Sequence, residues 1–119
     1  MTEFCGATAT SKYAMEIAIH EMTCVKAKIK FLSIEPLLAD MGKYDERPLK
    51  ELRIYNWVII GAQTKPYKPP KIEWVQEVLV ACHNADIPVF MKNNLQPLLD
   101  KSLGWEFWKL RREMPGQDW

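Results

Sequence analysis

The sequence predicts an α/β protein in which four mostly parallel strands are joined by crossover helices, as in a partial (βα) barrel. Strand-length apolar segments recur along the chain at residues 4–10, 28–35, 57–61 and 89–92. Two of the intervening stretches have the periodicity of amphipathic helices, at 12–25 and 71–84. Strands that alternate with helices pair in parallel through right-handed crossovers, and this predicts the fold class.

The first unit is a small, partly β-branched strand followed by a helix. Ser11 is a candidate N-cap, because its hydroxyl can accept a hydrogen bond from an early backbone N–H of the helix. Apolar residues then follow at i, i+3, i+4 and i+7 spacing, namely Met15, Ala18, Ile19 and Met22. Ala14 and Ile17 widen this face. We therefore predict a helix over 12–25 whose methionine-rich face packs in the core.

The second strand ends in the sequence Ser33-Ile34-Glu35-Pro36. Its apolar run suits a strand that is buried on both faces, and Pro36 stops the pairing because proline has no backbone N–H. Glu35 is therefore placed at the carboxyl end of a strand, where α/β proteins build their sites. A long polar connection follows over 39–55, in which Pro48 can begin a short helix.

The third strand, 57–61, is apolar and β-branched and closes with Gly61, which allows a tight turn or a close approach to a ligand. A proline-rich loop leads to the second helix, and Pro88 blocks its continuation. The inward stripe of that helix is predicted to be Ile72, Val75, Val78, Leu79 and Cys82. Asn93 and Asn94 follow the fourth strand.

The carboxyl-terminal part is predicted to hold two short helices, at 96–103 and 105–114, and a frayed end from residue 115. Trp105, Phe107, Trp108 and Leu110 are the expected packing groups of the last helix. A chain of 119 residues is normally one domain. We therefore interpret 1–119 as a single α/β domain in which 101–119 form a C-terminal helix and tail.

Composition excludes several classes of protein. Sixteen basic and fifteen acidic residues leave a net charge of +1, which provides no field for nucleic acid or an anionic membrane. No apolar run approaches the ~20 residues that span a bilayer. Cys5, Cys24 and Cys82 are odd in number and lack metal-ligand spacing, so we expect reduced, buried thiols, no metal site, and a cytoplasmic protein.

Polar and small residues at the strand ends form the candidate site, which we expect to converge at one edge of a parallel sheet. Glu35 and Lys92 are the candidate catalytic residues: Glu35 could act as a base or accept from a hydroxyl, and Lys92 could anchor an anion or form a Schiff base. The candidate ligand-binding residues are Thr10, Gly61, Gln63, Thr64 and Asn93. The alternative is structural, with Glu35 and Lys92 paired to each other and Gly61 serving only as a turn residue.

Three strand-end segments, FLSIEPLL (31–38), WVIIGAQT (57–64) and IPVFMK (87–92), occur in one order together with Trp74. In this order they resemble the carboxyl-terminal half of a family of phage-encoded and bacterial proteins of unknown function. That family is itself similar to radical S-adenosylmethionine (radical-SAM) (βα)-barrel proteins. The resemblance covers roughly residues 4–115.

The resemblance implies a complete or partial (βα) barrel whose other half carries three clustered cysteines for a [4Fe–4S] cluster, which cleaves S-adenosylmethionine. The cysteines of this chain do not match that pattern, so neither cofactor is expected on it. We expect a non-catalytic half-barrel that acts as an assembly or partner module, as a homo-oligomer or with a chain that supplies the missing half. The alternatives are a small-ligand-binding enzyme that uses Glu35 and Lys92, and a pure interaction module.

Overall fold

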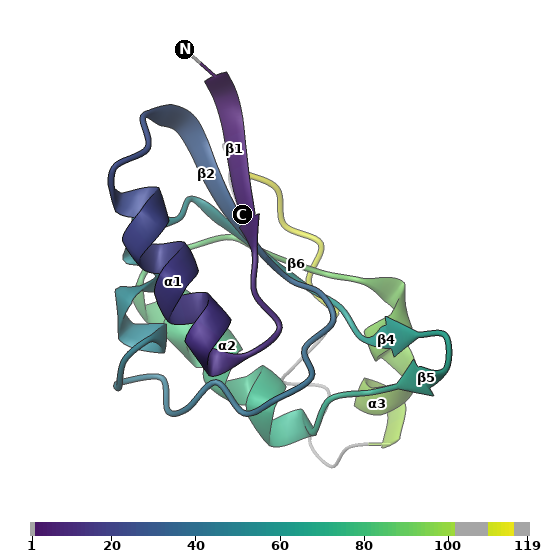
Figure 1. The fold of residues 1–119 in the computed structure, drawn as a ribbon. Coiled ribbons are helices and arrows are strands. Elements are labelled where there is room, and N and C mark those ends of the chain that lie inside the picture. The colour runs from purple at the N-terminus through teal and green to yellow at the C-terminus, as the bar shows by residue number, and fades with distance from the viewer. Residues whose placement is uncertain (1, 102–109, 116–119) are drawn as a thin grey trace.

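The computed structural model describes residues 2–101 and 110–115, which form a parallel four-stranded sheet with helices (Figure 1). The strands β1 (Thr2–Thr8), β2 (Ala27–Ile34), β3 (Trp57–Ile60) and β6 (Val89–Met91) lie in the order β1-β2-β3-β6. Every neighbouring pair is parallel, so the predicted fold class is confirmed. The α-helices are α1 (Lys12–Thr23), α2 (Ile72–Asn84) and α3 (Gln96–Lys101), and the 3-10 helices are η1 (Leu49–Ile54) and η2 (Asn93–Leu95).

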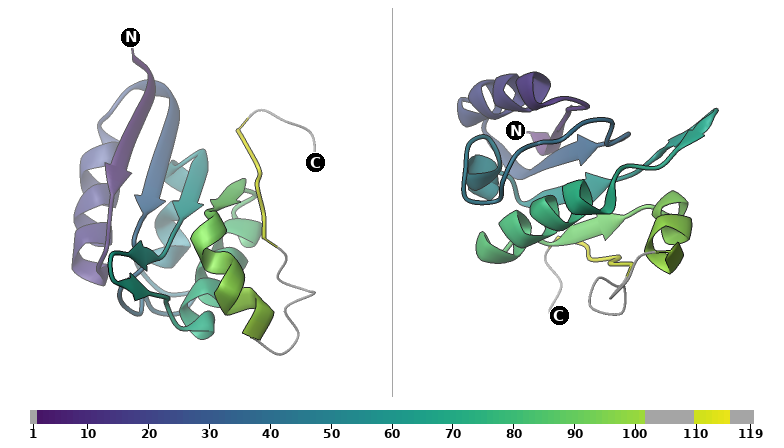
Figure 2. Two further views of the ribbon diagram at one scale, coloured as in Figure 1. Left: turned by 90° about the vertical axis from the view of Figure 1, so that its right-hand side faces the viewer. Right: turned by 90° about the horizontal axis from the view of Figure 1, so that it is seen from below.

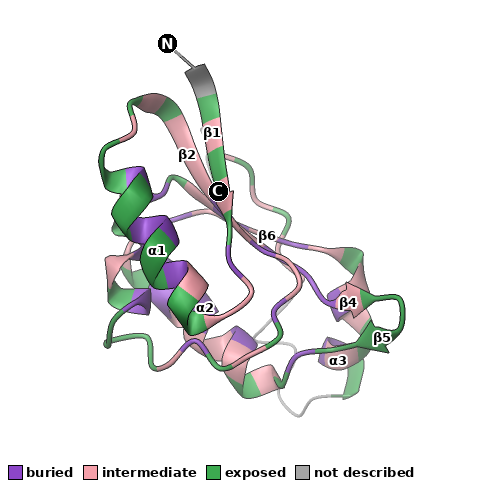
Figure 3. Cartoon of the chain, in the orientation of Figure 1, coloured by how far each residue is buried: buried purple, intermediate pink, exposed green. Residues whose placement is uncertain are grey.

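Helix α1 begins where the sequence predicts it. The Ser11 hydroxyl accepts a hydrogen bond from the Ala14 backbone N–H at 3.1 Å, which satisfies one of the free donors of the first turn. The four residues at helical spacing, Met15, Ala18, Ile19 and Met22, are all buried. Ile17 is instead 39% exposed, because α1 packs at the β1 edge of the sheet and one of its flanks stays in water (Figure 3).

The strands bury one face only among the described residues, so the prediction of burial on both faces is wrong. Alternate residues of β2 and β3 are fully buried toward the helices, namely Leu32, Ile34, Val58 and Ile60. Their neighbours Phe31, Ser33, Trp57 and Ile59 are half-buried. In the left view of Figure 2, α1 lies behind β1 and β2, and no helix lies in front of those strands.

Aromatic side chains gather on the face that the helices leave open. The rings of Phe31 and Trp57 are 5.9 Å apart, and those of Trp57 and Phe90 are 6.3 Å apart in an edge-to-face arrangement. The Phe31 ring lies over Gly6 of β1: a Cβ built on Gly6 would be only 2.2 Å from the nearest ring atom. Phe4 lies two residues before Gly6 in β1, so both residues face the same side of the sheet. The Phe4 side chain is 49% exposed. We call Phe4, Phe31, Trp57 and Phe90 the aromatic face.

The long connection between β2 and β3 is part of the core, although its sequence is mostly polar. Met41, Leu49, Leu52 and Tyr55 have at most 1% of their surface exposed. The Tyr55 hydroxyl donates to the Ala18 carbonyl of α1 at 3.0 Å, and burial raises the pKa of Tyr55 to about 12. The connection therefore fastens α1 and η1 to each other.

Residues 110–114 are not helical, so the predicted helix over 105–114 is wrong where the structure describes it. This segment runs antiparallel to β6, with a bridge between Phe90 and Arg112. The Met91 N–H donates to the Arg111 carbonyl at 2.6 Å, and the Glu113 N–H donates to the Val89 carbonyl at 2.9 Å. The segment is extended because the edge of β6 supplies partners for its backbone. Several predictions fall outside the described residues: the packing of Trp105, Phe107 and Trp108, the end of the helix predicted over 96–103, and the predicted fraying of 116–119.

Two further predictions need correction. The predicted proline-rich loop after the third strand contains an antiparallel hairpin of β4 (Gln63–Thr64) and β5 (Tyr67–Lys68). The three cysteines are free thiols, but they are not all buried as predicted. Cys82 is buried, and burial raises its pKa to about 12, whereas Cys24 is exposed at the end of α1.

Within residues 2–101 and 110–115, no helix has the length and apolarity needed to cross a bilayer.

Candidate functional site

The carboxyl ends of three neighbouring strands bring Glu35, Gly61 and Lys92 together. The Gly61 N–H donates to the Ile34 carbonyl at 3.1 Å, and the Lys92 N–H donates to the Ile60 carbonyl at 2.9 Å. These bonds continue the parallel ladders past the last residues of β2 and β3, so the three residues stay in register. The Lys92 ammonium lies 3.4 Å from Oε2 of Glu35. We call Glu35, Gly61 and Lys92 the rim.

Gly61 is needed at the rim for space. A Cβ built on it would lie 3.0 Å from Cγ of Glu35 and 3.2 Å from Cγ of Lys92, which is tighter than nearly all real Cβ contacts. Its φ is not in the positive region that favours glycine, whereas that of Gly42 is +90°. Because Gly61 has no side chain, the side chains of Glu35 and Lys92 can approach each other over it. The glycine is therefore required for space and not for a turn conformation.

The charges of the rim are largely satisfied by each other. Ser33 donates to the second carboxylate oxygen of Glu35 at 3.4 Å, so both oxygens have a partner. The side chains of Glu35 and Lys92 are 33% and 44% exposed, and water screens a pair of this kind. Exposed pairs contribute about 1 kcal/mol or less. This geometry matches the structural alternative; a catalytic or ligand-binding role for Glu35 and Lys92 stays a prediction.

Asn94 holds the segment after β3 against the segment after β6. Its Oδ1 accepts from the Ala62 N–H at 2.9 Å, and its Nδ2 donates to the Ala62 carbonyl at 3.0 Å. Its own carbonyl accepts from the Tyr67 hydroxyl at 2.7 Å. The amide of Asn94 therefore satisfies both the N–H and the C=O of Ala62, and so links the two segments beside the rim. The sequence offers two adjacent asparagines and no signal that separates their roles.

The other predicted ligand-binding residues lie in the segments that follow the strand ends, and a ligand-binding role for them stays a prediction. Gln63 and Thr64 lie in the β4–β5 hairpin, which projects beyond the sheet (Figure 1), and the Gln63 amide donates to the carbonyl of Pro66. The Asn93 side chain accepts from Arg112. Thr10 lies two residues past the end of β1, because that strand spans Thr2–Thr8 and not 4–10.

A family model described as "Protein of unknown function (DUF5131)" matches residues 3–106. The chain belongs to this family. The match runs from β1 past α3 and therefore includes the whole rim of this DUF5131 member. No curated protein and no solved structure matches the chain. The resemblance to a family of unknown function is thereby confirmed, while its radical-SAM likeness and phage origin stay predictions.

The residues of this DUF5131 chain do not fit an iron–sulfur cluster. Cys5 lies in β1, Cys24 follows α1 and Cys82 lies inside α2, so they come from three separate elements. A cluster needs several thiolates that converge on one site. In the described ranges, no three His, Cys, Asp or Glu side chains are grouped so that they could hold a metal ion.

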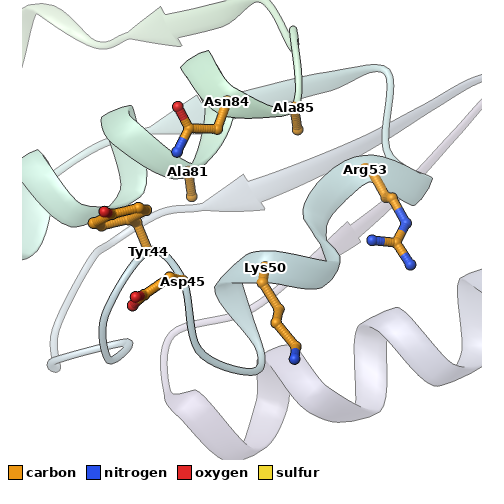
Figure 4. Close-up of a pocket in the computed structure, with 7 residues that line it drawn as sticks. All are labelled: Tyr44, Asp45, Lys50, Arg53, Ala81, Asn84 and Ala85. Atoms are coloured by element: carbon orange, nitrogen blue, oxygen red, sulfur yellow. The ribbon is translucent and has the colours of Figure 1, made fainter.

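A hollow of about 330 Å³ lies between η1, the connection before it and the end of α2 (Figure 4). It is lined by Tyr44, Asp45, Lys50, Arg53, Ala81, Asn84 and Ala85. Its charged side chains are exposed, and Figure 4 shows Lys50 and Arg53 extending away from the α2 residues on the other side of the hollow. Because α2 ends there and leads into the amino end of β6, this hollow lies away from the rim. Its polar groups do not converge as those of a binding site do.

Proposed function

We propose that this chain is an assembly module: half of a (βα)-barrel-like sheet whose open surfaces are covered by another polypeptide. The observation that supports this most is the combination of a parallel sheet with helices on one face and the aromatic face on the other. Parallel sheets are found almost only where both faces are covered. In a barrel the inner face is filled by side chains of the other strands.

The strand order supports a half-barrel. The strands follow one another as β1-β2-β3-β6, without the reversal of order that marks a doubly wound sheet. A sequential order with right-handed crossovers puts the crossover helices on one side, as in a barrel wall. A second half would continue this wall and enclose the aromatic face.

In this proposal the rim is the chain's contribution to a site that it shares with its partner. Barrel sites form at the carboxyl ends of the strands, which is where Glu35 and Lys92 lie. Under the radical-SAM likeness, S-adenosylmethionine and a [4Fe–4S] cluster would be held by the partner half, since the cysteines present here do not fit a cluster. The isolated chain would then be inactive.

Sedimentation equilibrium of the purified chain tests the proposal. We expect a mass above the 13.9 kDa of one chain at tens of micromolar, because self-association would cover apolar surface such as Phe4, which is 49% exposed in the single chain. Phe4→Glu should shift the chain toward monomer, since it puts a charge on the aromatic face. Tyr44→Glu, at a side chain that is 40% exposed and lies away from the sheet's open face, is the matched control and should not. A wild-type chain that is monomeric throughout would contradict the proposal.

A further inference from the structure

We propose that the outer edge of β1 binds a second copy of this chain by antiparallel strand addition, which joins two four-stranded sheets into one continuous sheet. This inference rests on the proposed function only in that the chain associates with a second copy. It names the outer edge of β1 as the contact, and an antiparallel joint there forms one extended sheet and not a closed barrel.

The backbone of β1 has one paired side and one free side. The Ala9 N–H donates to the Ser33 carbonyl of the β2 strand at 3.0 Å. Because N–H and C=O groups alternate in direction along a strand, those of Cys5 and Ala7 also face β2. Those of Phe4, Gly6 and Thr8 face outward, and within residues 2–101 and 110–115 no strand lies beside them.

The opposite edge of the sheet is already covered by the chain itself. Residues 111–113 pair with β6, and the Glu113 carboxylate also accepts from the Val89 N–H at 2.9 Å. The Trp57 indole donates to the Glu113 carbonyl at 2.9 Å. Among the strands that the structure describes, β1 therefore offers the longest unpaired edge, with seven residues. A pairing of this edge with itself is isologous and closes after two copies.

A groove of about 360 Å³ runs between β1 and α1 on the helix side of the sheet. One stripe of α1 lines it, with Ala14, Ile17, Ala18 and Glu21. The alanines leave room for a second helix to approach. Ile17 and Phe4, which lie on opposite faces of this edge, are 39% and 49% exposed, so pairing would bury apolar surface on both sides.

Charge favours a second copy as the occupant. Antiparallel pairing of two β1 strands also sets the two α1 helices antiparallel. Glu21, near the carboxyl end of α1, then approaches the amino end of the other α1, where the first turn carries Lys12 and no acid. A carboxylate near a helix N-terminus is favoured by the helix dipole, and the contact occurs twice in a two-fold dimer.

The register of full overlap makes a specific contact. If Thr2–Thr8 of both copies pair along their whole length, the middle residue Cys5 faces Cys5 of the second copy. The Cys5 backbone is bonded to β2, so this is a non-hydrogen-bonded pair, with Cα atoms about 4.5 Å apart. That distance lies within the range of disulfides. Cys5 is half-buried on the groove side, and Cys82 is buried away from it.

Mild oxidation with oxidised glutathione, followed by non-reducing electrophoresis, tests this contact. The Cys24→Ser variant, which retains Cys5, should form a covalent dimer as efficiently as the wild type. The Cys5→Ser variant, which retains the exposed Cys24, should lose most of it. If cross-linking follows Cys24 and not Cys5, the β1 contact is wrong.

Sedimentation of Thr8→Pro supplies a readout that does not depend on cysteine. Proline at this edge position removes an outward N–H and leaves the β1–β2 ladder intact, so the fold should persist. We expect the dimer dissociation constant to rise about tenfold or more, while Thr8→Ser, which keeps the N–H, has little effect. An assembled chain that is unaffected by Thr8→Pro overturns this inference alone; a wild-type monomer overturns the proposed function as well.

Discussion

Leu37→Ala is expected to lower the free energy of unfolding by about 2–5 kcal/mol, whereas the same change at the next residue, Leu38, should cost less than about 1 kcal/mol. Leu37 is fully buried and Leu38 is 44% exposed. Both follow the Glu35–Pro36 bond, and the Leu37 N–H donates to the Gly61 carbonyl at 2.8 Å. The backbone bond survives both substitutions, so the difference reports side-chain burial alone.

Chemical denaturation of the two variants measures this difference. It tests whether the connection between β2 and β3 belongs to the core, as the burial of Met41, Leu49 and Leu52 indicates. Equal and small losses for both leucines would show that the connection packs only loosely on the sheet.

Asn94→Ala is expected to destabilise the protein by about 1–3 kcal/mol, because it leaves the Ala62 N–H and C=O without their partner. Ala62 is only 4% exposed, so water cannot easily replace the lost bonds. Asn93→Ala is the matched control: Asn93 is exposed and its bond to Arg112 is at the surface, so the cost should stay below about 1 kcal/mol.

Thermal or urea unfolding of both variants gives the comparison. The reverse order, with Asn93 the costlier change, would mean that the segments after β3 and β6 are joined through the 110–115 segment and not through the Asn94 amide.

The sequence carried enough information to predict the sheet and the meeting of the rim residues. Short apolar runs such as Trp57–Ile60, separated by the helical spacing of Met15, Ala18, Ile19 and Met22, indicate parallel strands joined by helices. Once the strands are parallel, their carboxyl ends share one edge. Glu35, Gly61 and Lys92 then meet without any further information, as the 3.4 Å ion pair confirms.

Features that depend on tertiary contacts could not be predicted in this way. Leu110–Met114 has apolar and charged residues that suit a helix, but the β6 edge offers backbone partners that the sequence does not reveal. Ile17 fits the apolar face of α1 by spacing, yet α1 lies at the border of the sheet and the flank that carries Ile17 stays in water. The need for glycine at position 61 comes from two side chains distant in sequence, Glu35 and Lys92.

Nuclear Overhauser contacts in the isotope-labelled chain test whether the parallel strands bring Glu35, Gly61 and Lys92 together. We expect contacts from the Gly61 α-protons to the side-chain methylenes of both Glu35 and Lys92, since the Cγ atoms of both lie within 3.2 Å of the position that a Cβ would take. Parallel cross-strand contacts between β2 and β3 and between β3 and β6 should accompany them. Antiparallel contacts between these strands, or a Gly61 that contacts neither side chain, would contradict this arrangement.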